Sequence, residues 1–303
     1  PLMTPPRLIK ELYSIKPNLP IIPIIRTEER RQQIMGDFKL GIFGWFEPNH
    51  KSVSDLNDLL EHAMNFNHFY MELSPRNQKN MTPVGYGNMV GVSSSMTQIY
   101  HLMVQIMNKD VTTLLLGESG TGKNLVAQTM HQTGLRRDKS FIHVNCPAIP
   151  SELLESELFG HEKGSFTGAD ERKDGKFLAA NSGTIFLDEI GDMSPSLQAK
   201  ILRVLESGEI ERVGGAETHK VNVRIISATN QDLEAKIQQG TFRQDLYHRI
   251  NVFPISLPPL RDRPEDIPAT AFSILRSLVK KHNVAVKYIS PKGIRLLTEY
   301  SWP

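Results

Sequence analysis

A glycine-rich segment in the middle of the chain constrains the fold more than any other feature. It reads Gly-Glu-Ser-Gly-Thr-Gly-Lys over residues 117–123, directly after an apolar run at 111–116 and directly before a helical pattern at 125–131. Glycines let backbone N–H groups turn inward around phosphate oxygens, and the N-terminus of the following helix adds partial positive charge. A strand, a loop of this kind and a helix in this order form a P-loop. The sequence therefore predicts an α/β domain that binds a nucleoside triphosphate.

The residues of this loop have separate expected roles. The backbone surrounds the phosphates, while Lys123 reaches the β- and γ-phosphates. The P-loop pattern ends in Ser or Thr, whose hydroxyl contacts Mg²⁺, but here that position is Asn124. The candidate cofactor-binding residues of the segment are Gly117, Glu118, Ser119, Gly120, Thr121, Gly122, Lys123 and Asn124.

Two further strand ends supply candidate catalytic groups. An apolar segment at 184–187 ends in Asp188 and Glu189, and another at 221–226 leads to Asn230. We expect Asp188 to hold Mg²⁺ through water, and Glu189 to orient or deprotonate the attacking water. Asn230, at the carboxyl end of its strand, would point into the ligand crevice and either sense the γ-phosphate or position water. Taken alone, the acidic pair could instead be a solvated strand end, and Asn230 a turn residue.

The composition excludes several classes of protein. The net charge is +2, so bulk electrostatics indicates neither a nucleic-acid nor a membrane partner. No apolar run approaches the about 18 residues of a membrane-spanning helix. Cys146 is the single cysteine, which excludes an internal disulfide and favours a reducing, cytoplasmic setting. The chain lacks an initiator Met and stops at Pro303 within an expected folded region, so we interpret it as a fragment.

The segment 155–169 is the most specific part of the sequence. It reads Glu-Ser-Glu-Leu-Phe-Gly-His-Glu-Lys-Gly-Ser-Phe-Thr-Gly-Ala, and its glycines flank an aromatic residue and a hydroxyl. Glycines provide hinges and Phe166 a hydrophobic anchor, which is typical of an exposed functional loop, although spacing alone allows the ring to pack into the local core. Together with the P-loop and the acidic strand, this segment makes residues 88–303 resemble the AAA+ domain of bacterial enhancer-binding proteins, the sigma-54 activators. Ser165 stands where that family usually has Ala.

The resemblance implies a function. It implies a transcription activator that hydrolyses Mg²⁺-ATP and remodels the sigma-54 RNA polymerase holoenzyme so that promoters open. Asn145 would be the family's switch asparagine, which holds Glu189 inactive until the nucleotide state changes. The contact with sigma-54 would fall on Gly164, Phe166, Thr167 and Gly168.

The resemblance also implies assembly. Arg243 and Arg249 would be arginine fingers that reach across a subunit interface to the neighbour's γ-phosphate, so that hydrolysis requires a ring of subunits, a hexamer or heptamer. Without the resemblance, an ordinary surface ion pair with Asp245 would be the simpler interpretation. DNA binding and the sensor arginine would come from segments beyond Pro303.

Four parts are expected along the chain. Residues 1–64 more loosely resemble the C-terminal half of a flavodoxin-like response-regulator receiver, with short strands at 21–25 and 42–46. Residues 65–87 are expected as a linker, 88–259 as the α/β nucleotide-binding subdomain, and 260–303 as the truncated start of a helical lid. The receiver pattern has a Lys before a Pro after its last strand, whereas this chain has Glu47 and Pro48. A carboxylate there would repel a phosphoryl group, which predicts a degenerate receiver that does not respond to phosphorylation.

Several alternatives remain open. The chain could be a regulator that keeps the nucleotide site but barely turns ATP over, which Asn124 and Glu47 make conceivable. It could also be a AAA+ machine for another substrate, such as a protein unfoldase, although that class threads chains with an aromatic-hydrophobic pore loop. A methionine-rich stripe at helical spacing predicts core packing rather than a partner-binding face. The stripe consists of Met96, Ile99, Tyr100, Met103, Ile106 and Met107.

Overall fold

The computed structural model describes most of the chain as two compact units. One, here the central unit, covers residues 102–257, and the other, the outer unit, combines residues 1–101 with 258–303. The helices that the structure describes include none with the length and apolar character of a membrane span. The described residues are 52–72, 81–82, 85–282 and 289–303, together with 19–27, Leu8, Glu11, Leu12, Ile15, Phe43, Phe46 and Pro48.

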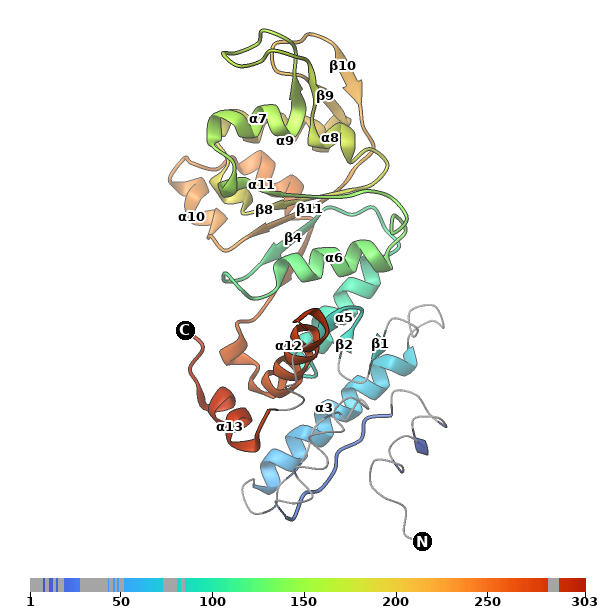
Figure 1. The fold of residues 1–303 in the computed structure, drawn as a ribbon. Helices are drawn as coiled ribbons and strands as arrows, with labels where there is room; N and C mark the ends of the chain where they lie inside the picture. Colours follow the sequence, from blue (N-terminus) through green and yellow to red (C-terminus); the bar gives the residue numbers. More distant parts are fainter. Residues whose placement is uncertain are drawn as a thin grey trace. The chain divides into compact units, whose positions relative to one another are not determined.

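A five-stranded sheet forms the middle of the central unit (Figure 1). Every neighbouring pair of its strands is parallel, and Ile185, Phe186 and Leu187 of the fourth strand are fully buried. Burial on both faces explains the near-continuous apolar runs of these strands. The predicted α/β class with a parallel sheet is confirmed. In spatial order the strands are β12 (Phe253–Ser256), β4 (Thr113–Leu116), β11 (Arg224–Thr229), β8 (Thr184–Asp188) and β5 (Phe141–Asn145).

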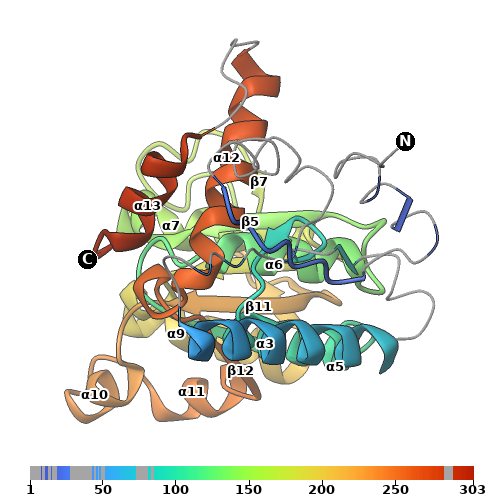
Figure 2. The same ribbon diagram turned by 90° about the horizontal axis from the view of Figure 1, so that it is seen from below.

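Helices cover both faces of this sheet, with α6 on one side and α7 and α9 on the other (Figures 1 and 2). The sequence defines the ends of α9 clearly, because Ser194 caps it, Pro195 opens it, and Gly208 closes it with a φ of 69°. The helices of the unit are α6 (Lys123–Thr133), α7 (Ser151–Phe159), α8 (Lys176–Ala179), α9 (Pro195–Ser207), α10 (Leu233–Gln238) and α11 (Gln244–Ile250).

Two short antiparallel hairpins extend beyond α7, α8 and α9, at the top of Figure 1. The first pairs β6 (Gly160–His161) with β7 (Lys173–Asp174), and the second pairs β9 (Glu209–Glu211) with β10 (Thr218–Lys220). The loop of the first hairpin contains the segment that the sequence singled out as a contact loop.

The outer unit contains helices and a small antiparallel sheet. Its elements are α3 (Val53–Glu72), β1 (Met81–Thr82), β2 (Gly85–Tyr86), β3 (Met89–Val90), the first part of α5 (Ser94–Ile106), α12 (Ile267–His282) and α13 (Pro291–Glu299).

All six members of the methionine-rich stripe are at most 3% exposed, which confirms core packing.

The N-terminal expectations differ from the structure in detail. The segments expected as strands meet in parallel through an isolated bridge between Ile24 and Phe46. Helix α3 runs eight residues beyond residue 64, and β1 to β3 lie in or beside the stretch 65–87 that was expected as a linker. Two-residue strands are too short to show an alternating pattern, so no sequence signal marks them. Glu47 lies outside the described residues.

Asp266 fastens the loop before α5 inside the outer unit. It is fully buried, and its Oδ1 accepts hydrogen bonds from the N–H groups of Val92 at 2.5 Å and Ser93 at 2.8 Å. Its Oδ2 accepts from the Ser93 hydroxyl at 2.8 Å. Burial raises the pKa of Asp266, against the opposing effect of these hydrogen bonds.

We expect Asp266→Ala to lower the free energy of unfolding by about 2–5 kcal/mol, because it leaves two buried N–H groups without an acceptor. Asp266→Asn keeps an acceptor oxygen for both N–H groups and an amide donor for Ser93, so it should cost much less. Denaturant unfolding of the chain measures both, and equal losses in the two variants would contradict this account.

The pH dependence of Asp266 has a definite sign. A carboxyl with a raised folded-state pKa binds its proton more tightly in the folded state. Its contribution to stability therefore falls as pH rises from the unfolded pKa of about 3.9 through the raised folded value. Asp266→Asn should lack this pH-dependent contribution to the free energy of unfolding.

Candidate active site

The glycine-rich loop adopts a conformation open to a ligand. Gly120 and Gly122 have φ values of 82° and 101°, and a Cβ built on either would meet no atom within 4 Å. Here glycine is needed for the backbone conformation rather than for space. Gly122 precedes the first turn of α6, whose N–H groups have no partner within the helix. The loop thus presents backbone donors and a helix N-terminus to open space, as phosphate binding requires.

Lys123 is held at the base of this loop. Its side chain is 6% exposed, and Nζ donates to the carbonyl oxygens of Gly117 at 2.8 Å and Glu118 at 3.2 Å. Nζ also lies 3.3 Å from Glu189 Oε1. A largely buried ion pair therefore joins the loop to the acidic strand end, although Lys123 and Glu189 are 66 residues apart in the chain.

Glu189 occupies an unusual backbone position directly after β8. Its φ of 55° and ψ of 54° are left-handed, a region that costs free energy for a residue with a side chain and is often found at functional sites. Its Oε2 accepts a hydrogen bond from the N–H of Asn230 at 2.9 Å. The carboxylate thus bridges the P-loop lysine and the end of β11, a role for the Asn230 backbone that the sequence did not predict.

Asp188 and Asn145 lie side by side at the carboxyl ends of β8 and β5. They are register partners in the parallel ladder, and Asn145 is exposed. Asp188 Oδ1 accepts from the N–H of Glu189 at 3.1 Å. The structure therefore brings the expected switch residue next to the acidic pair, while the switching role itself stays a prediction.

His143 belongs to this site although sequence reasoning missed it. Its Nε2 lies 3.7 Å from Asp188 Oδ2, and its ring stacks on Phe186 with centroids 5.0 Å apart. The available signal was its position two residues before Asn145, which places both side chains on one face of β5. Cys146 comes directly after this strand, and burial raises the pKa of its thiol to about 12, so it stays protonated at neutral pH.

The two candidate finger arginines lie on α11, with Arg243 at its N-cap. The Arg243 guanidinium makes two hydrogen bonds to Asp245, Nε–Oδ1 at 3.0 Å and Nη2–Oδ2 at 2.7 Å, so the simpler pairing considered above is present. Both partners are nearly half exposed, and such pairs contribute little to stability. Arg249 is 58% exposed and lies 3.5 Å from Glu206. Both arginines therefore lie at the surface in ion pairs of low expected stability.

The candidate contact residues gather at the loop of the β6–β7 hairpin. Gly164 and Gly168 have φ values of 80° and 98° and are exposed, as is Thr167. Phe166 is half-buried, and its ring packs edge-on against His161 with centroids 5.0 Å apart. The hydroxyl is therefore accessible, while the aromatic ring rests on its own hairpin.

Comparison with known proteins adds an independent finding. The family described as "Sigma-54 interaction domain" matches residues 89–256. The chain is 53% identical over 219 residues to the Nif-specific regulatory protein of Klebsiella pneumoniae, covering 72% of this chain and 42% of that protein. It is 41% identical over 296 residues to the DNA-binding transcriptional regulator NtrC of Proteus hauseri, covering 98% of this chain and 61% of that protein. The chain thus spans less than two thirds of the length of these relatives.

A solved structure agrees with these matches over the whole chain. NtrX from Brucella abortus in complex with ATP superposes with a TM-score of 0.66 at 31% identity, covering 100% of this chain and 64% of that one. A complex of the same protein with ADP gives the same values.

Proposed function

We propose, from the premise that this chain belongs to the sigma-54 interaction domain family, the AAA+ ATPase domain of NifA- and NtrC-like activators, that it hydrolyses ATP to remodel sigma-54 RNA polymerase. The observation that carries the proposal is the ion pair of Lys123 with Glu189 beneath an open P-loop. It places a phosphate-binding cation and a candidate base at one point. ATP supplies the phosphoanhydride bond, and the chain supplies binding, orientation and proton transfer.

The ion pair suggests how binding prepares hydrolysis. The Lys123 ammonium donates to two loop carbonyls and forms an ion pair with Glu189, and the γ-phosphate offers it a stronger partner. Once Lys123 turns to the phosphates, Glu189 loses that partner and is free to orient and deprotonate water. The hydrogen bond from the Asn230 N–H fixes the other carboxylate oxygen during this change.

The residues present fit Mg²⁺ at the same site. Mg²⁺ prefers oxygen ligands and keeps several of its waters, and the Asp188 carboxylate is 20% exposed at the strand end. Asn124 is exposed in the first turn of α6, where its amide oxygen can replace the usual hydroxyl. Asp188 would hold the ion through water, and Asn145 would report the nucleotide state to Glu189.

The proposal also includes macromolecular partners, namely sigma-54, further copies of this chain and DNA. Phe166 and Thr167 would contact sigma-54, Gly164 and Gly168 would act as hinges, and Arg243 or Arg249 would complete a neighbouring subunit's site in a ring. DNA binding would come from outside this chain. Residues 1–64 would be part of a receiver, which the parallel Ile24–Phe46 bridge and the NtrC match support. We expect acetyl phosphate, which phosphorylates receivers, to leave the ATPase rate of the full-length protein unchanged, and a large change in that rate would contradict a degenerate receiver.

The sigma-54 contact is tested by Thr167→Ala in the full-length protein. We expect the variant to hydrolyse ATP but to lose co-purification with sigma-54 in the presence of a transition-state nucleotide analogue, because the exposed hydroxyl is removed from the loop. Thr218→Ala, which removes an exposed hydroxyl bonded to Glu211 on the neighbouring hairpin, is the matched control and should bind normally. Normal sigma-54 binding by the Thr167 variant would reject the assignment of the loop.

A further inference from the structure

The loop that carries Phe166 is docked on the β9–β10 hairpin. Glu162 donates its N–H to the Val213 carbonyl at 3.0 Å, and Val213 donates to the Gly160 carbonyl at 2.9 Å. Gly214, with a φ of 74°, sits so close that a Cβ built on it would lie 2.6 Å from the Ser165 Cβ. Only glycine permits this approach, so the two hairpins meet in tight contact.

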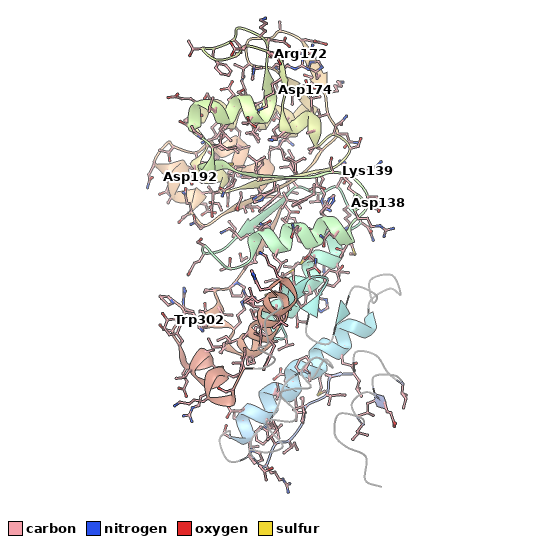
Figure 3. All side chains as sticks on the ribbon, viewed as in Figure 1. Asp138, Lys139, Arg172, Asp174, Asp192 and Trp302 are labelled. Atoms are coloured by element: carbon pink, nitrogen blue, oxygen red, sulfur yellow. The ribbon has the colours of Figure 1, made fainter. Side chains whose placement is uncertain are left out.

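A buried arginine reinforces the docked arrangement. Arg212 is 4% exposed, and its guanidinium reaches Glu162 at 3.2 Å and Asp174 at 2.9 Å on the first hairpin. It also lies 2.8 Å from His219 Nε2 on its own hairpin. Figure 3 labels Asp174 near the top of the view, below Arg172 of the same hairpin. The charged groups of the contact are therefore largely paired.

The Ser165 hydroxyl and the Arg212 Nε are exceptions in this contact. Both atoms are buried, and neither has a hydrogen-bond partner among the residues that the structure describes. A buried hydroxyl that loses water without gaining a partner opposes the state that buries it. If the loop leaves the β9–β10 hairpin, water can hydrate the hydroxyl again, so the group favours the undocked loop.

We propose that Ser165 is a positioning residue that weakens docking of the 162–170 loop on the β9–β10 hairpin and so increases the fraction of molecules in which the loop that carries Phe166 and Thr167 can move toward a partner. Alanine has the same Cβ as serine but lacks the hydroxyl. The contact between the two hairpins alone supports the effect of Ser165 on docking. The effect of docking on sigma-54 binding rests on the proposed function.

Hydrogen exchange of Ser165→Ala in the full chain tests the inference. The N–H of Glu162 donates to the Val213 carbonyl at 3.0 Å, and that of Val213 to the Gly160 carbonyl at 2.9 Å, so both amides lose their partners when the loop leaves the β9–β10 hairpin. When closing is faster than exchange, the exchange rate follows the open fraction. Removing the orphan hydroxyl should slow these amides about 5- to 100-fold. Sigma-54 binding with a transition-state nucleotide analogue should weaken, by at most the same factor.

Two further variants calibrate this measurement. Ser227→Ala removes another buried hydroxyl, in strand β11, that has no partner among the described residues, and it should leave exchange of these two amides unchanged. Gly214→Ala forces a Cβ into Ser165 at a left-handed φ and should speed exchange of the loop.

The possible results distinguish docking of the loop from its effect on sigma-54 binding. Unchanged loop exchange in Ser165→Ala would overturn the inference. Slower exchange with unaltered sigma-54 binding would leave docking intact but would reject its functional consequence. Slower exchange with weaker binding supports both.

Discussion

Glu189→Gln is expected to lower ATP turnover by about 10²–10⁴-fold while ATP still binds. Gln keeps an oxygen that can accept the 2.9 Å hydrogen bond from the Asn230 N–H, so the strand ends should stay in place. It cannot take a proton from water, and it removes the negative partner of Lys123. Steady-state phosphate release at high protein concentration measures turnover, and a fluorescent ATP analogue measures binding.

Asp192→Asn is the matched control for this prediction. Asp192 is an acidic residue close by in sequence, hydrogen-bonded to Gln231 at 2.7 Å and 3.8 Å from Lys236, and has no assigned chemistry. Its variant should retain nearly full turnover. If Glu189→Gln behaved like wild type, or if wild type released no phosphate, the non-hydrolysing regulator considered from the sequence would be the better description.

The largest effect is expected from the loss of an arginine finger. Arg249→Ala should reduce turnover by about 10³–10⁵-fold if its guanidinium stabilises charge at a neighbour's γ-phosphate. Its long contact to Glu206 leaves it free to act outside its own subunit. Lys123→Ala should also be inactive, because it cannot bind the phosphates. Mixing the two inactive proteins creates sites with an intact P-loop on one subunit and an intact finger on the next, so the mixture should regain part of the activity.

The mixing result decides between action across the interface and action within a subunit. A mixture that stays inactive, although both variants assemble, would contradict the finger assignment. Arg203→Ala removes another exposed arginine, paired with Glu209 and Glu211, and should have no effect. Arg243→Ala tests the second candidate. Asp245→Asn releases Arg243 from its ion pair and should not lower turnover if Arg243 is a finger.

Much of the candidate site could be predicted because its signals are local. The P-loop is a contiguous pattern with a strand before it and a helix after it, and Asp188 and Glu189 end an apolar run. In a parallel sheet, the carboxyl ends of neighbouring strands share one edge, so strand ends alone indicated that these groups converge. Their convergence follows from the strand order β4, β11, β8 and β5.

Some parts of the site lie outside what local patterns specify. His143 stands near Asp188 because β5 and β8 are neighbours in a defined register. The Asn230 backbone reaches Glu189 because β11 lies on the other side of β8. The two-residue strands of the outer unit likewise form through pairing with one another, which the apolar pattern of so short a segment cannot specify.

The sequence by itself determined the chemistry of the site, since residue type and spacing along one strand–loop–helix unit decide what can bind a phosphate. Only the tertiary structure decided which groups partner one another. Lys123 pairs with Glu189, and the Ser165 hydroxyl, which has no partner in the described part of the chain, is enclosed against Gly214. The physical reason is that hydrogen bonds and ion pairs depend on distances of a few ångströms between segments far apart in the chain, and packing alone sets those distances.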